Sequence, residues 1–222
     1  MKIFIDTADV DEIKRFAKLG ILDGVTTNPA LIAREGRDIK EVLNEIISLV
    51  DGPISGEVVS LDAESMIHEG RIIAKLHDNM VVKLPANIAG YEALNHLSAE
   101  GIKTNFTLIY TANQALMAAK LGATYVSPFV GRLDVTSTGG SELIREIAKI
   151  YNNYEFDTQI LAASMRTSVY VKEAALAGAH AATIPPAVLE DMLCSELSDL
   201  ALTGFLNQWN AMSDDKKTLF DE

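Results

Sequence analysis

The residue best suited to chemistry is a lysine inside a short apolar run, "MVVKLP" at 80–85. Two valines precede Lys83, and a leucine and a proline follow it. A lysine buried among apolar side chains needs an anionic partner or loses its proton more readily than a lysine in water. A deprotonated amine attacks carbonyl carbon and gives a Schiff base. Lys83 therefore predicts carbonyl chemistry; the alternative is a core salt bridge with Asp6 or Glu57.

Two carboxylates lie late in other apolar runs, Asp6 in "KIFID" and Glu57 in "PISGEVV". Schiff-base chemistry that cleaves or forms a C–C bond must move a proton on and off a departing hydroxyl. Carboxylates and a bridging water can do this, so both residues are candidate proton-transfer groups. Each also has a structural interpretation, since an aspartate before threonine can cap a helix.

Further polar or aromatic residues lie at or just beyond the ends of the apolar runs. They are Thr26, Thr27 and Asn28, then Asn105 and Thr107, then Ser127 and Phe129, and finally Ser164. Taken singly, such residues are more often turn or cap residues than ligands. Their repetition at successive run ends predicts one polar site.

Two arginines follow adjacent runs, Arg132 in "SPFVGRLD" and Arg166 in "AASMRT". Guanidinium groups bind oxyanions with two hydrogen bonds, and the Ser164 hydroxyl could add a third donor. The alternative for each arginine is a solvated or paired surface group. Their adjacency favours a phosphate site.

Other chemistries find little support. The four histidines lack metal-ligand spacing, so no metal site is predicted, and Cys194 is interpreted as a core cysteine of a late helix. No phosphate-binding P-loop, GxSxG or HExxH motif occurs.

Eight short apolar runs must position these residues. They span 2–6, 23–28, 53–59, 80–84, 101–105, 124–129, 158–164 and 179–185. Amphipathic segments lie between them, at 9–20, 38–52, 61–77, 89–99, 111–122, 140–151 and 167–178, with a weaker one at 186–193. Eight strand–helix units predict an α/β fold, a (β/α)8 TIM barrel. An open doubly wound sheet is the rival, but the first turn, "IDTADV", lacks the glycines of a dinucleotide site.

Alternation along the strands predicts which side chains point into the barrel. Phe4 should share a face with Asp6, Ser55 with Glu57, Val81 with Lys83, and Ala162 with Ser164. The carboxyl ends of barrel strands carry the chemistry, so Lys83 should lie beside two carboxylates near the top of the barrel.

The composition of the chain limits the partners and the cellular compartment that the sequence predicts. The chain has 222 residues, 48% of them hydrophobic, and a net charge of −12, which argues against nucleic acid or an anionic membrane as a partner. A single cysteine and an N-terminus without an apolar signal core predict a cytoplasmic protein. Residues 1–222 are predicted to form one barrel domain, with 195–222 as a C-terminal helical arm. A helical face of that arm, at 197–209, could pack on its own barrel or on a neighbour.

Five motifs resemble the transaldolase family in the short form that it shares with fructose-6-phosphate aldolases. They are "DGVTTNP", "VVKLP", "KTNFTLIY", "ATYVSPFVGRLD" and "QILAASMR", and the resemblance runs from "FIDTA" to "TIPP". It implies sugar-phosphate substrates and class I aldol chemistry, without a metal or organic cofactor, in the pentose phosphate pathway. A dihydroxyacetone unit would pass from fructose 6-phosphate or sedoheptulose 7-phosphate to an aldose phosphate such as erythrose 4-phosphate. The family also implies a homo-oligomer, a pentamer or decamer, in which the terminal helix reaches a neighbour.

The resemblance assigns roles residue by residue. Lys83 matches the Schiff-base lysine and Asp6 the carboxylate of C–C cleavage, while Glu57 and Thr107 match the pair that holds a catalytic water. The substrate-binding residues fall into two groups: Asn28, Asn105, Thr26 and Ser127 around the dihydroxyacetone hydroxyls, and Arg132, Ser164 and Arg166 around the phosphate.

Two positions separate the subfamilies. Glu57 and Phe129 match the transaldolase pattern, whereas the aldolase pattern has glutamine and tyrosine there. The motif departs from many members at Ala86 and Asn87, where they carry methionine and threonine, and this loop flanks Lys83. Three functions therefore stay open: a transaldolase, a fructose-6-phosphate aldolase, and a non-catalytic sugar-phosphate-binding barrel with Lys83 only ion-paired.

Overall fold

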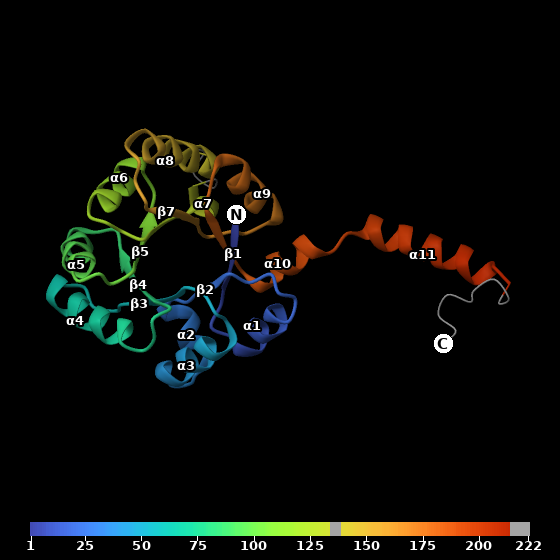
Figure 1. Ribbon diagram of the computed structural model, residues 1–222, viewed down its shortest axis with the longest axis horizontal. Coiled ribbons are helices and arrows are strands. Elements are labelled where there is room, and N and C mark those ends of the chain that lie inside the picture. Colours follow the sequence, from blue (N-terminus) through green and yellow to red (C-terminus); the bar gives the residue numbers. More distant parts are fainter. Residues whose placement is uncertain (134–138, 214–222) are drawn as a thin grey trace.

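The computed structural model describes residues 1–133 and 139–213, and its centre is a closed barrel of eight parallel strands (Figure 1). The strands are β1 (Lys2–Asp6), β2 (Gly24–Thr26), β3 (Ile54–Glu57), β4 (Met80–Pro85), β5 (Thr104–Ile109), β6 (Tyr125–Pro128), β7 (Gln159–Ala162) and β8 (Ala181–Ile184). Each strand pairs with the next, and β8 pairs with β1. The predicted (β/α)8 fold is confirmed, and the open sheet is excluded because the barrel closes.

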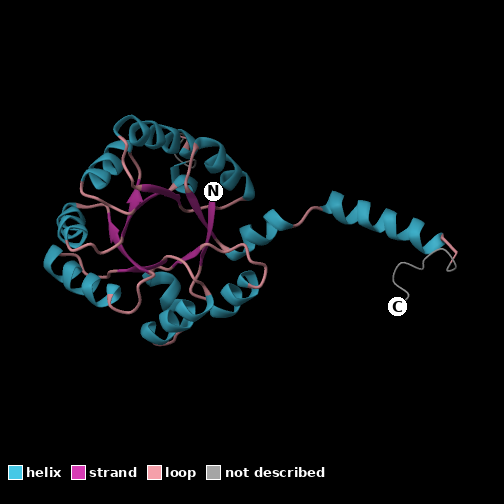
Figure 2. Cartoon of the chain, in the orientation of Figure 1, coloured by secondary structure: helices cyan, strands magenta, loops and turns pink. Residues whose placement is uncertain are grey.

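Helices surround the barrel, except the last, which extends away from it (Figure 2). They are α1 (Val10–Ala17), α2 (Pro29–Glu35), α3 (Ile39–Leu49), α4 (Ala63–Ala74), α5 (Ile88–Ala99), α6 (Ala112–Lys120), α7 (Val130–Leu133), α8 (Gly140–Tyr154), α9 (Ser168–Ala177), α10 (Pro186–Leu193) and α11 (Glu196–Ala211). The short helices α2 and α7 were not predicted. Neither is long enough for its apolar periodicity to stand out in the sequence.

Polar residues cap the starts of most helices by accepting hydrogen bonds from first-turn amides. They are Asp9, Asn28, Asp38, Asp62, Asn87, Thr111 and Thr167. Because Asp9 caps α1, the structural interpretation of Asp6 as a helix cap is wrong. The Asp6 carboxylate is left for the site.

The floor of the barrel is an apolar plug made by Phe4, Val81, Tyr125, Leu161 and Ala181. The rings of Phe4 and Tyr125 meet edge to face, with centroids 5.9 Å apart. These side chains fill the interior, so polar residues one step further along each strand must face the open end of the barrel.

The predicted alternation is confirmed for three strands and wrong for the seventh. Phe4 and Val81 belong to the plug, one alternation below Asp6 and Lys83. In β7, however, Leu161 points inward, whereas Ala162 packs in the core between the strands and the outer helices. β7 ends at Ala162, and Ser164 follows in a left-handed backbone conformation with φ of 61°, so strand parity no longer applies to it.

The helix α11 extends away from the barrel as an arm (Figure 1). None of its residues is buried, and it exposes Leu197, Leu200, Leu202, Phe205, Leu206 and Trp209. Packing of this helix on its own barrel is therefore not observed, and residues 214–222 of the predicted arm lie outside the described residues. Cys194 is exposed just after α10, so its interpretation as a core cysteine is wrong. No helix in the described ranges has the length and apolarity needed to cross a lipid bilayer.

Candidate active site

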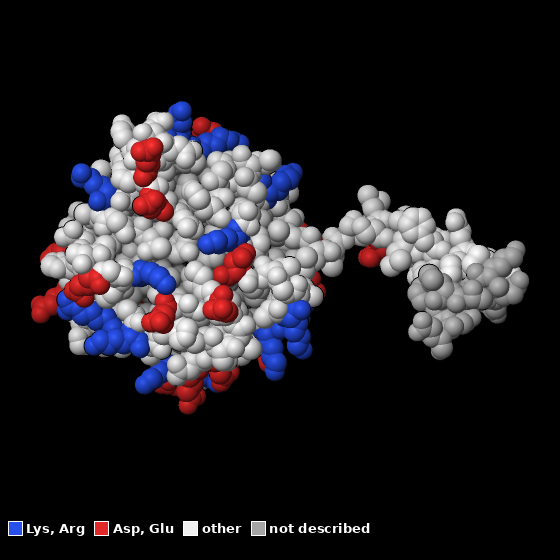
Figure 3. Space-filling view, in the orientation of Figure 1, with Lys and Arg blue, Asp and Glu red and all other residues white. Residues whose placement is uncertain are grey.

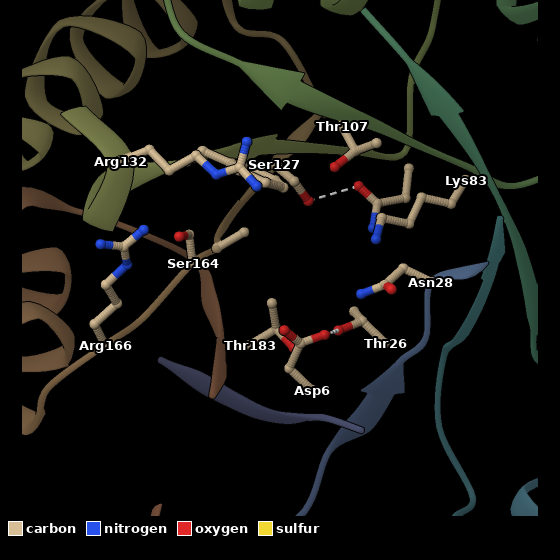
Figure 4. Close-up of a pocket in the computed structure, with 13 residues that line it drawn as sticks. Asp6, Thr26, Asn28, Lys83, Thr107, Ser127, Arg132, Ser164, Arg166 and Thr183 are labelled. Atoms are coloured by element: carbon tan, nitrogen blue, oxygen red, sulfur yellow. Dashed lines mark hydrogen bonds between the residues drawn. The ribbon is translucent and has the colours of Figure 1, made fainter. Parts of the chain in front are cut away.

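A polar cavity of about 230 Å³ opens at the carboxyl ends of the strands (Figure 4). Its lining residues come from six of the eight strands and from the segments that follow β2, β6 and β7: Asp6, Thr26, Asn28, Lys83, Asn105, Thr107, Ser127, Phe129, Arg132, Ala163, Ser164, Arg166 and Thr183. Every predicted site residue except Glu57 is in this set. The barrel thus gathers residues that are up to 177 positions apart in the sequence, as the strand-end argument predicted.

Lys83 is buried and carries its amine to the cavity wall. Its Nζ lies 3.0 Å from Glu57 Oε2 and donates a 3.1 Å hydrogen bond to the Thr27 carbonyl. The ion pair confirms that a buried lysine needs an anionic partner. A purely structural pair would be sealed from ligand, but this amine also faces an open cavity, which leaves it accessible to a carbonyl compound.

Asp6 lies across the cavity from Lys83 (Figure 4). Thr26 Oγ1 donates a 2.7 Å hydrogen bond to Asp6 Oδ1, and the Thr183 hydroxyl lies 2.5 Å from that of Thr26. Burial raises the pKa of Asp6, while the charge of Lys83 and the Thr26 hydrogen bond oppose that rise. A carboxylate whose protonated form is favoured in this way is suited to accept and return a proton.

Asn105 and Ser127 form a buried polar pair deep in the cavity. Ser127 Oγ donates to Asn105 Oδ1 at 2.7 Å, and Asn105 Nδ2 donates to Ser55 Oγ at 3.1 Å. Both bonds hold the amide in one orientation. One of its two N–H groups is not used by these bonds, so the amide can donate to a ligand hydroxyl.

Asn28 lines the cavity from the start of α2. Its Oδ1 accepts a 3.0 Å hydrogen bond from the Leu31 amide, as a helix cap does. This bond engages the oxygen and leaves the amide N–H groups available. Asn28 is therefore both a cap and a candidate ligand.

Thr107 has a buried hydroxyl for which no described residue supplies a hydrogen-bond partner. The next residue, Leu108, has a φ of 62°, and the pairing of β5 with β6 shifts register between Phe106 and Ile109. This left-handed leucine is strained. An unpaired buried hydroxyl at a strained point of the wall is a place for a ligand or a water.

Three residues at the side of the cavity opposite Lys83 could bind an oxyanion. Arg132, Ser164 and Arg166 lie together there, on α7 and the loop after β7 (Figure 4). The Arg132 guanidinium lies 5.6 Å from the centroid of Phe129, and Nη1 is 3.5 Å from the Tyr110 hydroxyl. Ring packing holds the arginine while leaving most of its donors free.

A glycine allows α7 and the loop after β7 to approach each other. A Cβ added to Gly131 would lie 2.2 Å from the Ser164 carbonyl oxygen and 3.1 Å from Arg166 Cγ. Only a residue without a side chain lets α7 approach the loop after β7 so closely. Gly131 thereby sets the spacing between Arg132 and the pair Ser164 and Arg166.

The remaining predicted residue, Glu57, lines a second lobe of the cleft. This lobe, of about 430 Å³, shares Asn28, Lys83, Thr107, Phe129 and Arg132 with the first cavity. Lys83 thus lines both lobes, and Glu57 lies 3.0 Å from its amine. Figure 3 views the barrel from the amino ends of its strands, the end opposite this cleft, and shows acidic and basic side chains interspersed there.

Sequence reasoning missed Thr183, which ends "AHAATIP" and completes the hydrogen-bond chain to Asp6. The same search for polar residues late in each run would have found it in the eighth strand. Arg34, on the unpredicted helix α2, was also missed, and no strand-end signal points to it. No cluster of three or more possible metal ligands occurs among residues 1–133 and 139–213.

Fold and site together define a (β/α)8 barrel with a polar, lysine-centred cavity at the carboxyl ends of its strands. The sequence matches the family described as Transaldolase/Fructose-6-phosphate aldolase over residues 3–221. The chain belongs to this family.

Individual relatives agree with the family match. A protein named probable transaldolase from Caldicellulosiruptor saccharolyticus is 58% identical over 210 residues, which cover 94% of this chain and 97% of the relative. Another of that name, from Thermoanaerobacter sp. (strain X514), is 56% identical over 94% of this chain and 97% of its own length. A third, from Agathobacter rectalis, is 55% identical over 97% of this chain and all of its own length. The match therefore extends across the barrel and much of the arm.

Proposed function

We propose that this protein is a transaldolase that transfers a dihydroxyacetone unit between sugar phosphates through a Schiff base on Lys83. The observation that carries the proposal is the position of the Lys83 amine, paired with Glu57 and open to a cavity that also holds Asp6 and two arginines. Family membership and the names of the relatives favour the same activity. The donor would be fructose 6-phosphate or sedoheptulose 7-phosphate.

The first step forms the Schiff base. Lys83 must lose its proton, and Glu57, 3.0 Å from Nζ, is placed to accept it. The amine attacks the C2 carbonyl of the ketose phosphate and gives a carbinolamine, whose hydroxyl leaves as water when it is protonated. The unpaired Thr107 hydroxyl, together with Glu57, would hold the water that carries these protons.

The second step breaks the bond between C3 and C4. Asp6 takes the proton of the C4 hydroxyl, the C3–C4 bond cleaves, and its electron pair moves into the iminium to give an enamine on Lys83. The C4 oxygen becomes the aldehyde of the departing aldose phosphate. An acceptor aldose phosphate such as erythrose 4-phosphate reverses these steps, and hydrolysis then releases the new ketose phosphate.

The other site residues would bind the substrate. Asn28, Asn105 and Ser127 present amide and hydroxyl groups suited to the C1 and C3 hydroxyls, and Thr26 supports Asp6. Arg132, Ser164 and Arg166 would hold the phosphate at the far end of the chain. No step requires a metal or an organic cofactor.

The alternative is an aldolase that releases free dihydroxyacetone. Phe129 lines both lobes beside Lys83, and its ring carries no hydroxyl that could assist water attack on the bound intermediate. Glu57 and Phe129 both follow the transaldolase pattern, so we propose transfer as the main reaction. In the cell, this reaction belongs to the pentose phosphate pathway.

Turnover of fructose 6-phosphate with and without erythrose 4-phosphate tests this choice. We expect glyceraldehyde 3-phosphate only when the acceptor is present. Equal product without the acceptor would show an aldolase. Phe129→Tyr should raise release of free dihydroxyacetone relative to transfer, and a silent substitution would argue against this role of Phe129.

Borohydride reduction tests the Schiff base itself. Incubation with fructose 6-phosphate and borohydride should add the three-carbon unit to Lys83, identified by peptide mass spectrometry. Lys83→Met should lower turnover by at least about a thousandfold and remove the adduct. Lys120→Met, on the exposed end of α6, is the matched control. Substrate binding without an adduct in the native protein would instead support a non-catalytic sugar-phosphate-binding barrel.

We also propose that the protein is a cytoplasmic homo-oligomer, a pentamer or decamer, in which the arm packs on a neighbouring copy. The support is the row of exposed apolar residues on α11, which would gain from burial. Light scattering of the native protein and of a Leu200→Asp, Phe205→Asp variant tests this. The variant should dissociate to smaller species, and an unchanged mass would contradict the proposal.

A further inference from the structure

The second lobe of the cleft carries a positive charge that the proposed chemistry does not use. Besides the residues shared with the first cavity, it is lined by Pro29, Ala30, Leu31, Arg34, Glu57 and Leu108. Its volume, about 430 Å³, is large enough for a sugar phosphate. The lobe adjoins the first cavity at Lys83, and we call it the mouth of the cleft.

Arg34 is the charge in question. It lies in the last turn of α2, is exposed, and has no ion pair or hydrogen bond to any residue in the described part of the chain. The nearby Arg37 shows the opposite behaviour, because it forms a salt bridge with Glu45. Arg34 is thus an arginine that lines a cavity and has all its donors available.

The charge balance of the lobe favours an anion. Glu57 is the one carboxylate among its lining residues, and Lys83 already neutralises it at 3.0 Å. Arg34 and Arg132 then leave the lobe net positive, in a protein whose net charge is −12. Such a local reversal of the overall field concentrates anions at a cleft.

Arg132 connects the two lobes. It lines the mouth together with Arg34, and it lines the inner cavity together with Arg166. A phosphate held between Arg34 and Arg132 could therefore move to Arg166 without losing its contact with Arg132. Arg34, Arg132 and Arg166 thus line the two lobes in succession, and guanidinium groups are suited to bind a phosphate dianion.

We propose that Arg34 and Arg132 form a second anion site at the mouth of the cleft, which captures the phosphate of incoming sugar phosphates before they reach Lys83. This inference rests on the proposed function, since it assigns the class of ligand that the mouth selects. Arg34 is a specificity-determining residue in this scheme and takes no part in bond making or breaking.

Acceptor selectivity provides the kinetic test. The native protein, Arg34→Gln and Arg37→Gln are compared for kcat/KM with erythrose 4-phosphate and with unphosphorylated erythrose, at saturating fructose 6-phosphate and low ionic strength. For Arg34→Gln the ratio of the two values should fall about three- to fivefold, as expected for one charge contact at a partly solvated site. The deficit should shrink at high salt, where such contacts are screened. Arg37→Gln should keep the native ratio.

A binding experiment separates this inference from the proposed reaction. Inorganic phosphate is titrated into the native protein and the two variants, without substrate, and followed by calorimetry. Weaker phosphate binding by Arg34→Gln than by Arg37→Gln would support the anion site even if transfer activity were absent. Equal binding and an unchanged acceptor ratio, in variants with native melting temperatures, would overturn it.

Discussion

The Thr26 hydroxyl donates a 2.7 Å hydrogen bond to the Asp6 carboxylate, and that bond favours the charged form of a carboxyl whose pKa burial raises. Thr26→Val keeps the side-chain shape and removes the bond. The pKa of Asp6 should rise further, because one of the two effects that oppose burial is lost. Since the mechanism needs Asp6 deprotonated for cleavage, the acidic limb of the kcat profile should move to higher pH.

The measurement is the pH dependence of transfer in the native protein and in Thr26→Val. Thr158→Val is the matched control, because this buried threonine donates to the Ala123 carbonyl far from the site. An acidic limb that stays in place or moves to lower pH would contradict the role of Thr26.

Ionisation of the buried Asp6 carboxyl should also lower the stability of the folded protein. Its folded-state pKa is raised, so the folded protein holds the proton more tightly than the unfolded chain does, and stability is lost as pH rises through the folded pKa. Asp6→Asn removes this loss. The melting temperature of the variant, relative to the native protein, should therefore increase as the pH is raised from about 4, near the ordinary pKa of an aspartate, to about 8. A difference that does not vary with pH would mean that Asp6 titrates alike in both states.

Glu57 should control how fast the Schiff base forms. Glu57→Gln keeps the size of the side chain but removes the acceptor for the Lys83 proton, 3.0 Å away. We expect trapping by borohydride to slow about a hundred- to ten-thousandfold, the usual contribution of one proton-transfer group. The exposed Glu64 on α4, changed to glutamine, is the control. A native trapping rate in Glu57→Gln would leave Glu57 as an ion-pair partner only.

Gly131 should be necessary for the arrangement of Arg132, Ser164 and Arg166 that we propose binds phosphate. The Cβ of alanine would meet the Ser164 carbonyl at 2.2 Å, so α7 and the loop after β7 must move apart. Gly131→Ala should cost about 1–3 kcal/mol of stability, as overpacking does, and should raise KM for fructose 6-phosphate more than it lowers kcat. Gly204→Ala, on α11 with open space around the added Cβ, should do neither. An unchanged KM in Gly131→Ala would show that substrate binding tolerates the separation of α7 from the loop after β7.

Most of the residues that line the cavity could be predicted from their positions at the ends of the strands. Because side chains alternate along a strand, the parity of "MVVKLP" already placed Lys83 on the inward face with Val81, and the same rule held for Asp6. Closure of the barrel then brings the carboxyl ends of all strands together, whatever the sequence separation. Regular strands made this part of the prediction possible.

What strand patterns could not predict depends on irregular backbone and on short elements. Ser164 reaches the cavity through a left-handed turn after β7, and Leu108 takes up a similar conformation at the register shift beside Thr107. Neither residue is a glycine, so the residue types do not predict these turns. Arg34 lies on a seven-residue helix, too short to be recognised by periodicity.

The apolar plug under Lys83 has a kinetic consequence. Phe4, Tyr125 and their neighbours fill the barrel below the cavity, so the cleft is a blind pocket on that side. An aldose that departs and an aldose that arrives must then use the same inner space, and they cannot occupy it together. Double-reciprocal plots at several acceptor concentrations should accordingly be parallel, with each aldose phosphate competing against the other for the lysine-bound three-carbon unit.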